Sequence, residues 1–313
     1  MDARSLALTG LGLRLKELGY QCVAITPETH RRVLGRPVRS TSLRSIFGWN
    51  QPFAREAVDP MIFDLMVKAE ALETHGDRFK SSVRFATAGD LLFVHSGFPT
   101  TEPDAVFFGP DTYRFIRALR ASLADVTTRG PAPLRLIDIG CGSGAGGIFA
   151  AHTLPAPAEV ILADINPKAL AFSAINAALN DLPSAKTVLS DVLEGIEGDA
   201  DVIMANPPYL VDQHRRIYRH GGDGLGTSLA VRIAQQSLPR LAPNGRLILY
   251  SGAPIVEGID LFFEILRPVL QLHAGQYSYE EIDPDVFGEE LGNDVYADVD
   301  RIAAVLLTAT KQG

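Results

Sequence analysis

From Gly130-Pro131 onward, short runs rich in β-branched residues alternate with segments of helical periodicity. This alternation predicts right-handed crossovers and a mostly parallel sheet with helices on both faces, an α/β fold. Helical patterns begin near Ser143, Pro167, Thr227 and Glu257. The seven runs predicted as strands are 134–140, 159–165, 185–191, 199–207, 245–252, 269–282 and 300–310. A seven-stranded sheet therefore accounts for most of the chain after residue 130.

The first hundred residues have a mainly helical pattern instead. Apolar residues recur at three-to-four spacing near the start of the chain and again from Ile62 to Leu72, as on the buried face of a helix. Between them, Arg31–Arg44 holds five arginines and no acid, which predicts a loop or a pair of short helices. Alternation around Gly89-Asp90 predicts a hairpin. We expect residues 1–100 to form a mainly helical cap or substrate domain, and residues 101–313 to form the domain that contains the sheet.

The composition is that of an ordinary globular protein, with 46% hydrophobic and 21% charged residues. Two cysteines, Cys22 and Cys141, exclude a disulfide framework or a four-thiolate zinc site and favour a reducing compartment. No histidine pair has metal-ligand spacing with a carboxylate, so no metal is expected. The formal charge of −8 argues against an extended nucleic-acid footprint, because phosphate binding draws on clustered Lys and Arg.

The apolar stretch at the start of the chain is too short to span a membrane. Arg14 and Lys16 interrupt it long before the about 20 apolar residues that a spanning helix needs. The stretch is therefore predicted to be an amphipathic helix of a cytoplasmic protein with no membrane contact.

A glycine-rich turn, DIGCGSG from Asp138 to Gly144, joins the first predicted strand to a helix. Glycines permit a tight turn and close approach of the backbone to a ligand, and the helix N-terminus adds unpaired N–H groups. With Ala145 the string also fits G-x-G-x-x-A, so alone it does not decide between NAD and another adenosine-bearing cofactor. Asp138 favours an adenosine-bearing cofactor other than NAD, because a carboxylate would crowd a pyrophosphate but suits an amino-acid ammonium.

Two further acids close the second and third strands. Asp164, with Ile165 after it, lies about 20 residues beyond the glycine turn, where an acid can accept both ribose hydroxyls of an adenosine. A simple helix cap is the competing interpretation. Asp191 would lie beside an adenine amino group, with Val192 against the ring. Three acids at successive strand ends together predict a charged nucleoside ligand.

The fourth strand ends in Asn206-Pro207-Pro208-Tyr209. Two consecutive prolines fix φ and remove both N–H donors, so the carbonyls there are predicted to be unpaired with any continuing ladder. The amide oxygen of Asn206 and the carbonyl of Pro207 then form two acceptors for the hydrogens of a planar or primary amine, and Tyr209 supplies a ring face. Because strand ends of an open parallel sheet converge on the ligand crevice, we expect the amine to meet the nucleoside there.

The ordered set DIGCGSG, ADINP, SDV and NPPY, within Val106 to Tyr250, resembles the class I S-adenosylmethionine-dependent methyltransferases with an NPPY motif. The resemblance is to the release-factor glutamine N5-methyltransferases and the exocyclic-amine N-methyltransferases. It implies a Rossmann-like catalytic domain at 101–313 and S-adenosylmethionine as cofactor. The cofactor-binding residues it implies are Asp138, Gly140, Cys141, Gly142, Gly144, Asp164, Ile165, Asp191, Val192, Asn206, Phe108 and Thr112. The catalytic residues it implies are Asn206, Pro207 and Tyr209.

The function expected is N-methyl transfer to an amide or amine of a small molecule or protein. An alternative keeps the cofactor but lets the N-terminal segment close the site, so that the cofactor's own amine attacks its γ-carbon. That reaction gives azetidine-2-carboxylate and methylthioadenosine, as in the azetidine-2-carboxylate synthases. A non-catalytic binding module or a rewired NAD protein is a third hypothesis. The SGAP string after the fifth strand and the Arg31–Arg44 stretch depart from the family, which leaves the acceptor open.

Overall fold

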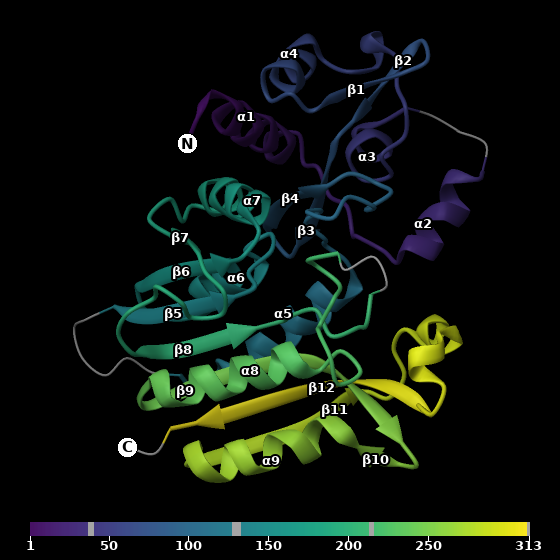
Figure 1. The fold of residues 1–313 in the computed structure, drawn as a ribbon. Coiled ribbons are helices and arrows are strands. Elements are labelled where there is room, and N and C mark those ends of the chain that lie inside the picture. The colour runs from purple at the N-terminus through teal and green to yellow at the C-terminus, as the bar shows by residue number, and fades with distance from the viewer. Residues whose placement is uncertain (37–40, 127–132, 213–215, 312–313) are drawn as a thin grey trace.

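The computed structural model describes residues 1–36, 41–126, 133–212 and 216–311. Its central sheet has the strand order β11-β12-β9-β8-β5-β6-β7 (Figure 1). Neighbouring strands from β9 to β7 are parallel, β12 is antiparallel to both of its neighbours, and β10 is a short extra strand on β9. The strands are β5 (Leu134–Ile139), β6 (Ala158–Asp164), β7 (Lys186–Leu189), β8 (Ala200–Ala205), β9 (Leu241–Val256), β10 (Ile259–Asp260), β11 (Gln276–Asp283) and β12 (Arg301–Thr310). The predicted seven-stranded α/β sheet is confirmed.

Helices cover both faces of this sheet because successive strand residues point to opposite sides. Leu136 packs in one core with residues of α5 and α6, and its neighbour Ile137 packs in another with residues of α8 and α9. The helices are α5 (Pro110–Ser122), α6 (Ala145–Thr153), α7 (Pro167–Leu179), α8 (Ser228–Ser237) and α9 (Leu261–His273), with the 3-10 turns η2 (Leu238–Arg240), η3 (Gly288–Gly292) and η4 (Asp294–Tyr296).

The N-terminal hundred residues combine helices with two hairpins. The hairpin predicted at Gly89-Asp90 is confirmed, and α2 and α3 fall in the arginine-rich stretch, of which residues 37–40 lie outside the described ranges. The expectation that Leu72 continues a helix was wrong. The helix ends at Lys68 and Leu72 begins β1, because pairing with β2 overrides the local apolar period. The elements are α1 (Ala3–Glu17), α2 (Pro27–Leu34), α3 (Leu43–Phe47), η1 (Arg55–Ala57), α4 (Pro60–Lys68), β1 (Leu72–His75), β2 (Arg78–Ser81), β3 (Val83–Ala88) and β4 (Leu91–Ser96).

Two asparagines, one in α7 and one directly after its last residue, join the N-terminal hairpin to the rest of the protein. Asn176 and Asn180, each at most 1% exposed, hydrogen-bond both the N–H and the C=O of Val94 and Leu92 respectively, at 2.7–3.0 Å. Their side chains thus take the place of a neighbouring strand for β4. Residues of α1, α4 and β4 also share a hydrophobic core with α7, and the N-terminal elements lie beside it in Figure 1.

Candidate cofactor and acceptor site

A cavity of about 930 Å³ lies at the carboxyl ends of β5, β6 and β8, at the upper end of the range for small-molecule sites. It is where the parallel strands were expected to place the polar residues that follow them. The structure brings most of the predicted site residues to its wall. These are Thr112, Asp138, Gly140, Cys141, Gly142, Asp164, Ile165, Asp191, Val192, Asn206, Pro207 and Tyr209.

Two predicted residues are not in that wall. Phe108 is 1% exposed and packs on Phe93 with ring centroids 5.4 Å apart, while its neighbour Phe107 lines the cavity. Gly144 has a φ of 77°, and a Cβ there would lie 3.0 Å from Ser173 Cβ. Gly144 therefore serves the turn and the packing of α6 on α7, and the structure gives it no place facing the ligand space.

Asp138 is a buried carboxylate at the end of β5. It is 2% exposed and accepts a hydrogen bond of 2.8 Å from the Gly147 N–H in α6. Burial raises its pKa to about 7, and nearby Asp164 adds to the rise, whereas the Gly147 bond opposes it. A buried acid of this kind is stabilised in its charged form by a cationic ligand.

Asp164 fixes the glycine turn from the neighbouring strand. Its carboxylate accepts hydrogen bonds from the N–H groups of Gly142 at 2.8 Å and Asn166 at 2.9 Å. Burial nevertheless raises its pKa, against the effect of these bonds. Asn166 itself caps α7, its side chain accepting from the Lys168 N–H at 3.0 Å. The helix cap and the cavity-lining acid are thus adjacent, separate features of one strand end.

Asp191 and Val192 follow β7 at the edge of the cavity. Arg232 of α8 donates to both carboxylate oxygens of Asp191, at 2.9 and 2.5 Å, a partner that the sequence did not reveal. Val192 is 4% exposed and has a φ of 59°, a conformation that is rare for a β-branched residue and is found where a site constrains the backbone.

The Asn206-Pro207-Pro208-Tyr209 segment leaves β8 and enters the cavity wall. Within the described ranges, the Asn206 side chain makes no hydrogen bond. Tyr209 is 6% exposed and packs against Tyr250 and Phe287, with ring centroids 6.1 and 5.8 Å away. A Cβ on Gly252 would lie 2.3 Å from the Tyr209 ring, so protein neighbours take part of the ring surface that was expected to stack on an acceptor.

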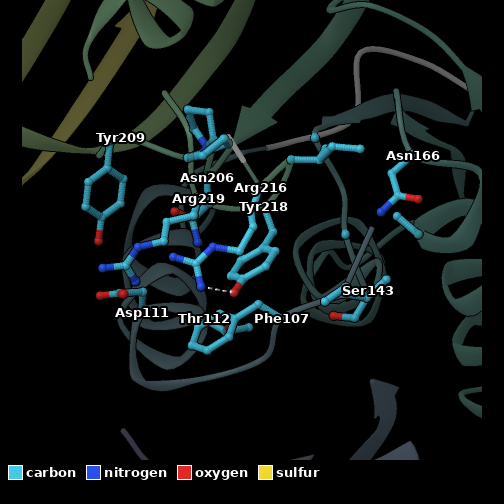
Figure 2. A pocket seen from close by; sticks show the side chains of 18 of the residues that line it. Phe107, Asp111, Thr112, Ser143, Asn166, Asn206, Tyr209, Arg216, Tyr218 and Arg219 are labelled. Atoms are coloured by element: carbon cyan, nitrogen blue, oxygen red, sulfur yellow. Dashed lines mark hydrogen bonds between the residues drawn. The ribbon is translucent and has the colours of Figure 1, made fainter. Parts of the chain in front are cut away.

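The loop after this segment supplies site residues that were absent from the predicted set. Arg216, Tyr218 and Arg219 line the cavity (Figure 2). The Tyr218 ring stacks on Phe107, with centroids 5.9 Å apart, and its hydroxyl donates to the Thr100 carbonyl at 2.7 Å. These contacts join two segments that are more than a hundred residues apart in the chain, which no local pattern reveals.

Acidic residues hold the two arginines of this loop. Asp212 pairs with Arg216 and, at 3.5 Å, with Arg219, which also pairs with Glu290 near the C-terminus. These arginines hold the pKa of Asp212 at about 2, chiefly through the Arg216 bond. The charges of Arg216 and Arg219 are therefore paired with carboxylates within the protein.

Helix α2 forms part of the N-terminal wall of the cavity. Thr26, Pro27, Glu28 and Arg31 line it, and Arg31 pairs with Glu28. The start of the arginine-rich stretch therefore lies at the cavity. Among the described residues no helix has the length and apolarity needed to cross a bilayer, and no group of three or more potential metal ligands was found in the same ranges.

Residues 123–254 match the family described as "Methyltransferase small domain". A release factor glutamine methyltransferase of Deinococcus radiodurans is 31% identical over 164 residues, which are 50% of this chain and 55% of that protein. A ribosomal RNA small subunit methyltransferase C of Pasteurella multocida is 30% identical over 147 residues, 46% of this chain and 40% of that protein. The chain thus spans about half the length of the curated relatives it matches.

Among solved structures, a 16S rRNA N2 methyltransferase of T. thermophilus, in complex with AdoMet and guanosine, is similar. It has a TM-score of 0.48 and 19% identity, and the match covers 80% of this chain and 62% of that one.

The match of residues 123–254 to a methyltransferase domain, together with the fold and the cavity, supports a methyltransferase of the class I S-adenosylmethionine-dependent type, for which S-adenosylmethionine is the cofactor. Within that class, it is similar to the release factor glutamine methyltransferases and to ribosomal RNA methyltransferases. Its residues fit this cofactor, since buried carboxylates suit a sulfonium and an ammonium and the glycine turn admits a close ligand. Relatives named for ribosomal RNA leave the expectation of no nucleic-acid partner without support.

Proposed function

We propose that this protein transfers a methyl group to an amide or amine nitrogen held by Asn206, Pro207 and Tyr209. The observation that carries the proposal is the Asn206 side chain, which lines the cavity and has no hydrogen-bond partner within the described residues. An amide oxygen left without a partner at a strand end is suited to accept a hydrogen bond from a substrate N–H.

The cofactor would lie along the neighbouring strand ends. We assign its ammonium to Asp138, its ribose to Asp164 and its adenine amine to Asp191, all of which line the cavity. When bound, S-adenosylmethionine supplies an electrophilic methyl group on a positively charged sulfur. Oxygens at Asn206 and Pro207 would hold the hydrogens of the acceptor nitrogen and gain strength as positive charge develops on it, which favours the transition state over the ground state.

We further propose that residues 1–100 act as a cap on this catalytic domain. The support is that Thr26, Glu28 and Arg31 of this segment line the cavity. The same observation favours one alternative, the cyclisation of S-adenosylmethionine to azetidine-2-carboxylate, because a covered site suits a small or internal acceptor. A small molecule or a protein side chain is the acceptor that we propose for transfer.

Product analysis tests the proposal. The pure protein is incubated with S-adenosylmethionine alone, and then with a release factor, with small-subunit ribosomal RNA or with free glutamine, and the products are identified by mass spectrometry. We expect S-adenosylhomocysteine and an acceptor that is heavier by one methyl group, and no reaction without acceptor. Methylthioadenosine with a four-membered-ring amino acid from S-adenosylmethionine alone would instead establish the cyclase, and tight binding of NAD alone would contradict both.

A further inference from the structure

A buried carboxylate on the acceptor side of the cavity has no role in the function proposed so far. Asp111 lies in the first turn of α5, is 9% exposed and lines the cavity together with Asn206 and Tyr209. A helix N-terminus stabilises the charged form of an acid. Burial has the opposite and larger effect, and the pKa of Asp111 is raised.

Within the described residues, the hydrogen bonds of normal geometry that Asp111 accepts reach one of its two oxygens, Oδ1. The Tyr250 hydroxyl and the Arg114 guanidinium both donate to Oδ1, each at 3.0 Å, and Arg114 pairs on its other side with Asp283 at 3.0 Å. The Tyr209 hydroxyl is buried, lies close to Asp111 and Tyr250, and makes no hydrogen bond of normal geometry within the described residues.

Figure 2 shows the Tyr209 side chain directed toward Asp111. Within the described residues, Oδ2 accepts no hydrogen bond of normal geometry, so it is the oxygen that we assign to a proton from a group held beside Tyr209.

The other carboxylates of the cavity wall are committed elsewhere. Asp138 and Asp164 accept backbone hydrogen bonds near the glycine turn, and Asp191 is held by Arg232. On the acceptor side, Arg219 pairs with Glu290, and Glu289 is exposed to solvent. Among the carboxylates that line the described part of the cavity, Asp111 is thus the buried one beside Tyr209.

We propose that Asp111 accepts the proton that the acceptor nitrogen loses when it is methylated. The lone pair of the nitrogen forms the new N–C bond, the bond from the methyl carbon to sulfur breaks with its electrons on sulfur, and the N–H proton passes to Oδ2 of Asp111. The carboxyl group then returns the proton to water. This inference rests on the proposed function and adds a proton acceptor to it. Positioned bases of this kind contribute about 10²–10⁴-fold in rate.

Three variants test the proposal, with the acceptor identified by the product analysis above. Asp111→Asn is expected to lower kcat by about 10²-fold or more and to remove the acidic limb of the pH–rate profile. Its affinity for S-adenosylhomocysteine, measured by calorimetry, is expected to stay at the wild-type value. Tyr250→Phe removes a donor to the charged carboxylate, so it should move that limb to higher pH by about one unit. This variant keeps the test available if Asp111→Asn does not fold.

Glu281→Gln is the control. It removes the exposed carboxylate that pairs with Arg301, lies outside the cavity wall, and should leave the profile unchanged. Equal losses of kcat and S-adenosylhomocysteine affinity in Asp111→Asn, or wild-type pH profiles in both Asp111→Asn and Tyr250→Phe, would overturn the proposal. If the wild-type protein transfers no methyl group to any of the acceptors, the proposed function is contradicted, and the role proposed for Asp111 loses its basis.

Discussion

The carboxylate of Asp164 and the backbone N–H of Gly142 are joined by a hydrogen bond of 2.8 Å. The bond connects the end of β6 to the glycine turn after β5, so the acid that we assign to the ribose also holds the loop that approaches the cofactor. Cofactor affinity and the shape of the turn therefore depend on the same side chain.

Replacing Asp164 tests this double role. Asp164→Ala is expected to weaken S-adenosylhomocysteine binding by at least about tenfold, because charge-assisted hydrogen bonds are worth about 1.5–3 kcal/mol each. Isothermal titration calorimetry measures the change. Glu159→Ala is the control, since Glu159 lies at the opposite end of β6 in an exposed pair with Lys186. If both variants bind like the wild type, Asp164 is not a cofactor ligand.

The pKa of about 7 for Asp138 predicts that cofactor affinity depends on pH. Only the ionised carboxylate attracts an ammonium, so affinity should fall as pH drops below about 7, at most tenfold per unit. Asp138→Asn should bind the cofactor more weakly than the wild type at pH 8, and its affinity should not show this fall below pH 7. Asp164 is present in both proteins, so the difference between the two binding curves isolates Asp138. Identical curves would exclude it from the ammonium site.

The same carboxyl group should affect stability in the opposite direction. Because its pKa is raised on folding, the native state binds the proton more tightly than the unfolded state does. The stability contributed by the protonated form is present at low pH and is lost as pH rises from about 4 to about 7. In thermal unfolding without ligand, the Tm of Asp138→Asn relative to that of the wild type should therefore rise across that pH range. A constant difference in Tm would contradict the burial of an ionisable group here.

Asn176 provides a test of how the N-terminal segment is attached. Its side chain bonds to the N–H and C=O of Val94 and to the Ser143 carbonyl in the glycine turn. Asn176→Ala leaves three buried backbone groups without partners, and should lower the free energy of unfolding by about 3 kcal/mol or more. Denaturant titration measures this change in the free energy of unfolding. Lys168→Ala, in the same helix but with an exposed partner, should cost less than about 1 kcal/mol. Similar costs for the two would refute the strand-like role of Asn176.

The sequence was sufficient for the sheet and for the residues directly after its strands. Alternating apolar runs identify a parallel sheet, and parallel strands place Asp138, Asp164 and Asn206 at one edge whatever the rest of the chain does. The side of the site built by other segments could not be predicted in this way. Arg216 and Glu290 reach the cavity through loops whose paths depend on tertiary contacts.

Tertiary contacts also explain why the sequence led to the wrong residue at some positions. Phe107 and Phe108 are adjacent aromatic residues outside regular structure, so no periodicity tells which of them faces the ligand. Asp111 lies in the first turn of α5, but its place beside Tyr209 depends on how α5 packs against β9. Leu72 fits a helical period until β1 pairs with β2.

The most direct test of the central claim compares two measurements on Asn206→Ala. If the Asn206 amide holds the acceptor nitrogen while the carboxylates of the other strand ends hold the cofactor, methyl transfer should fall by about 10²-fold or more. The affinity for S-adenosylhomocysteine should remain at the wild-type value, and Lys168→Ala should change neither. Transfer that survives in Asn206→Ala, or transfer and affinity that fall together, would contradict the account.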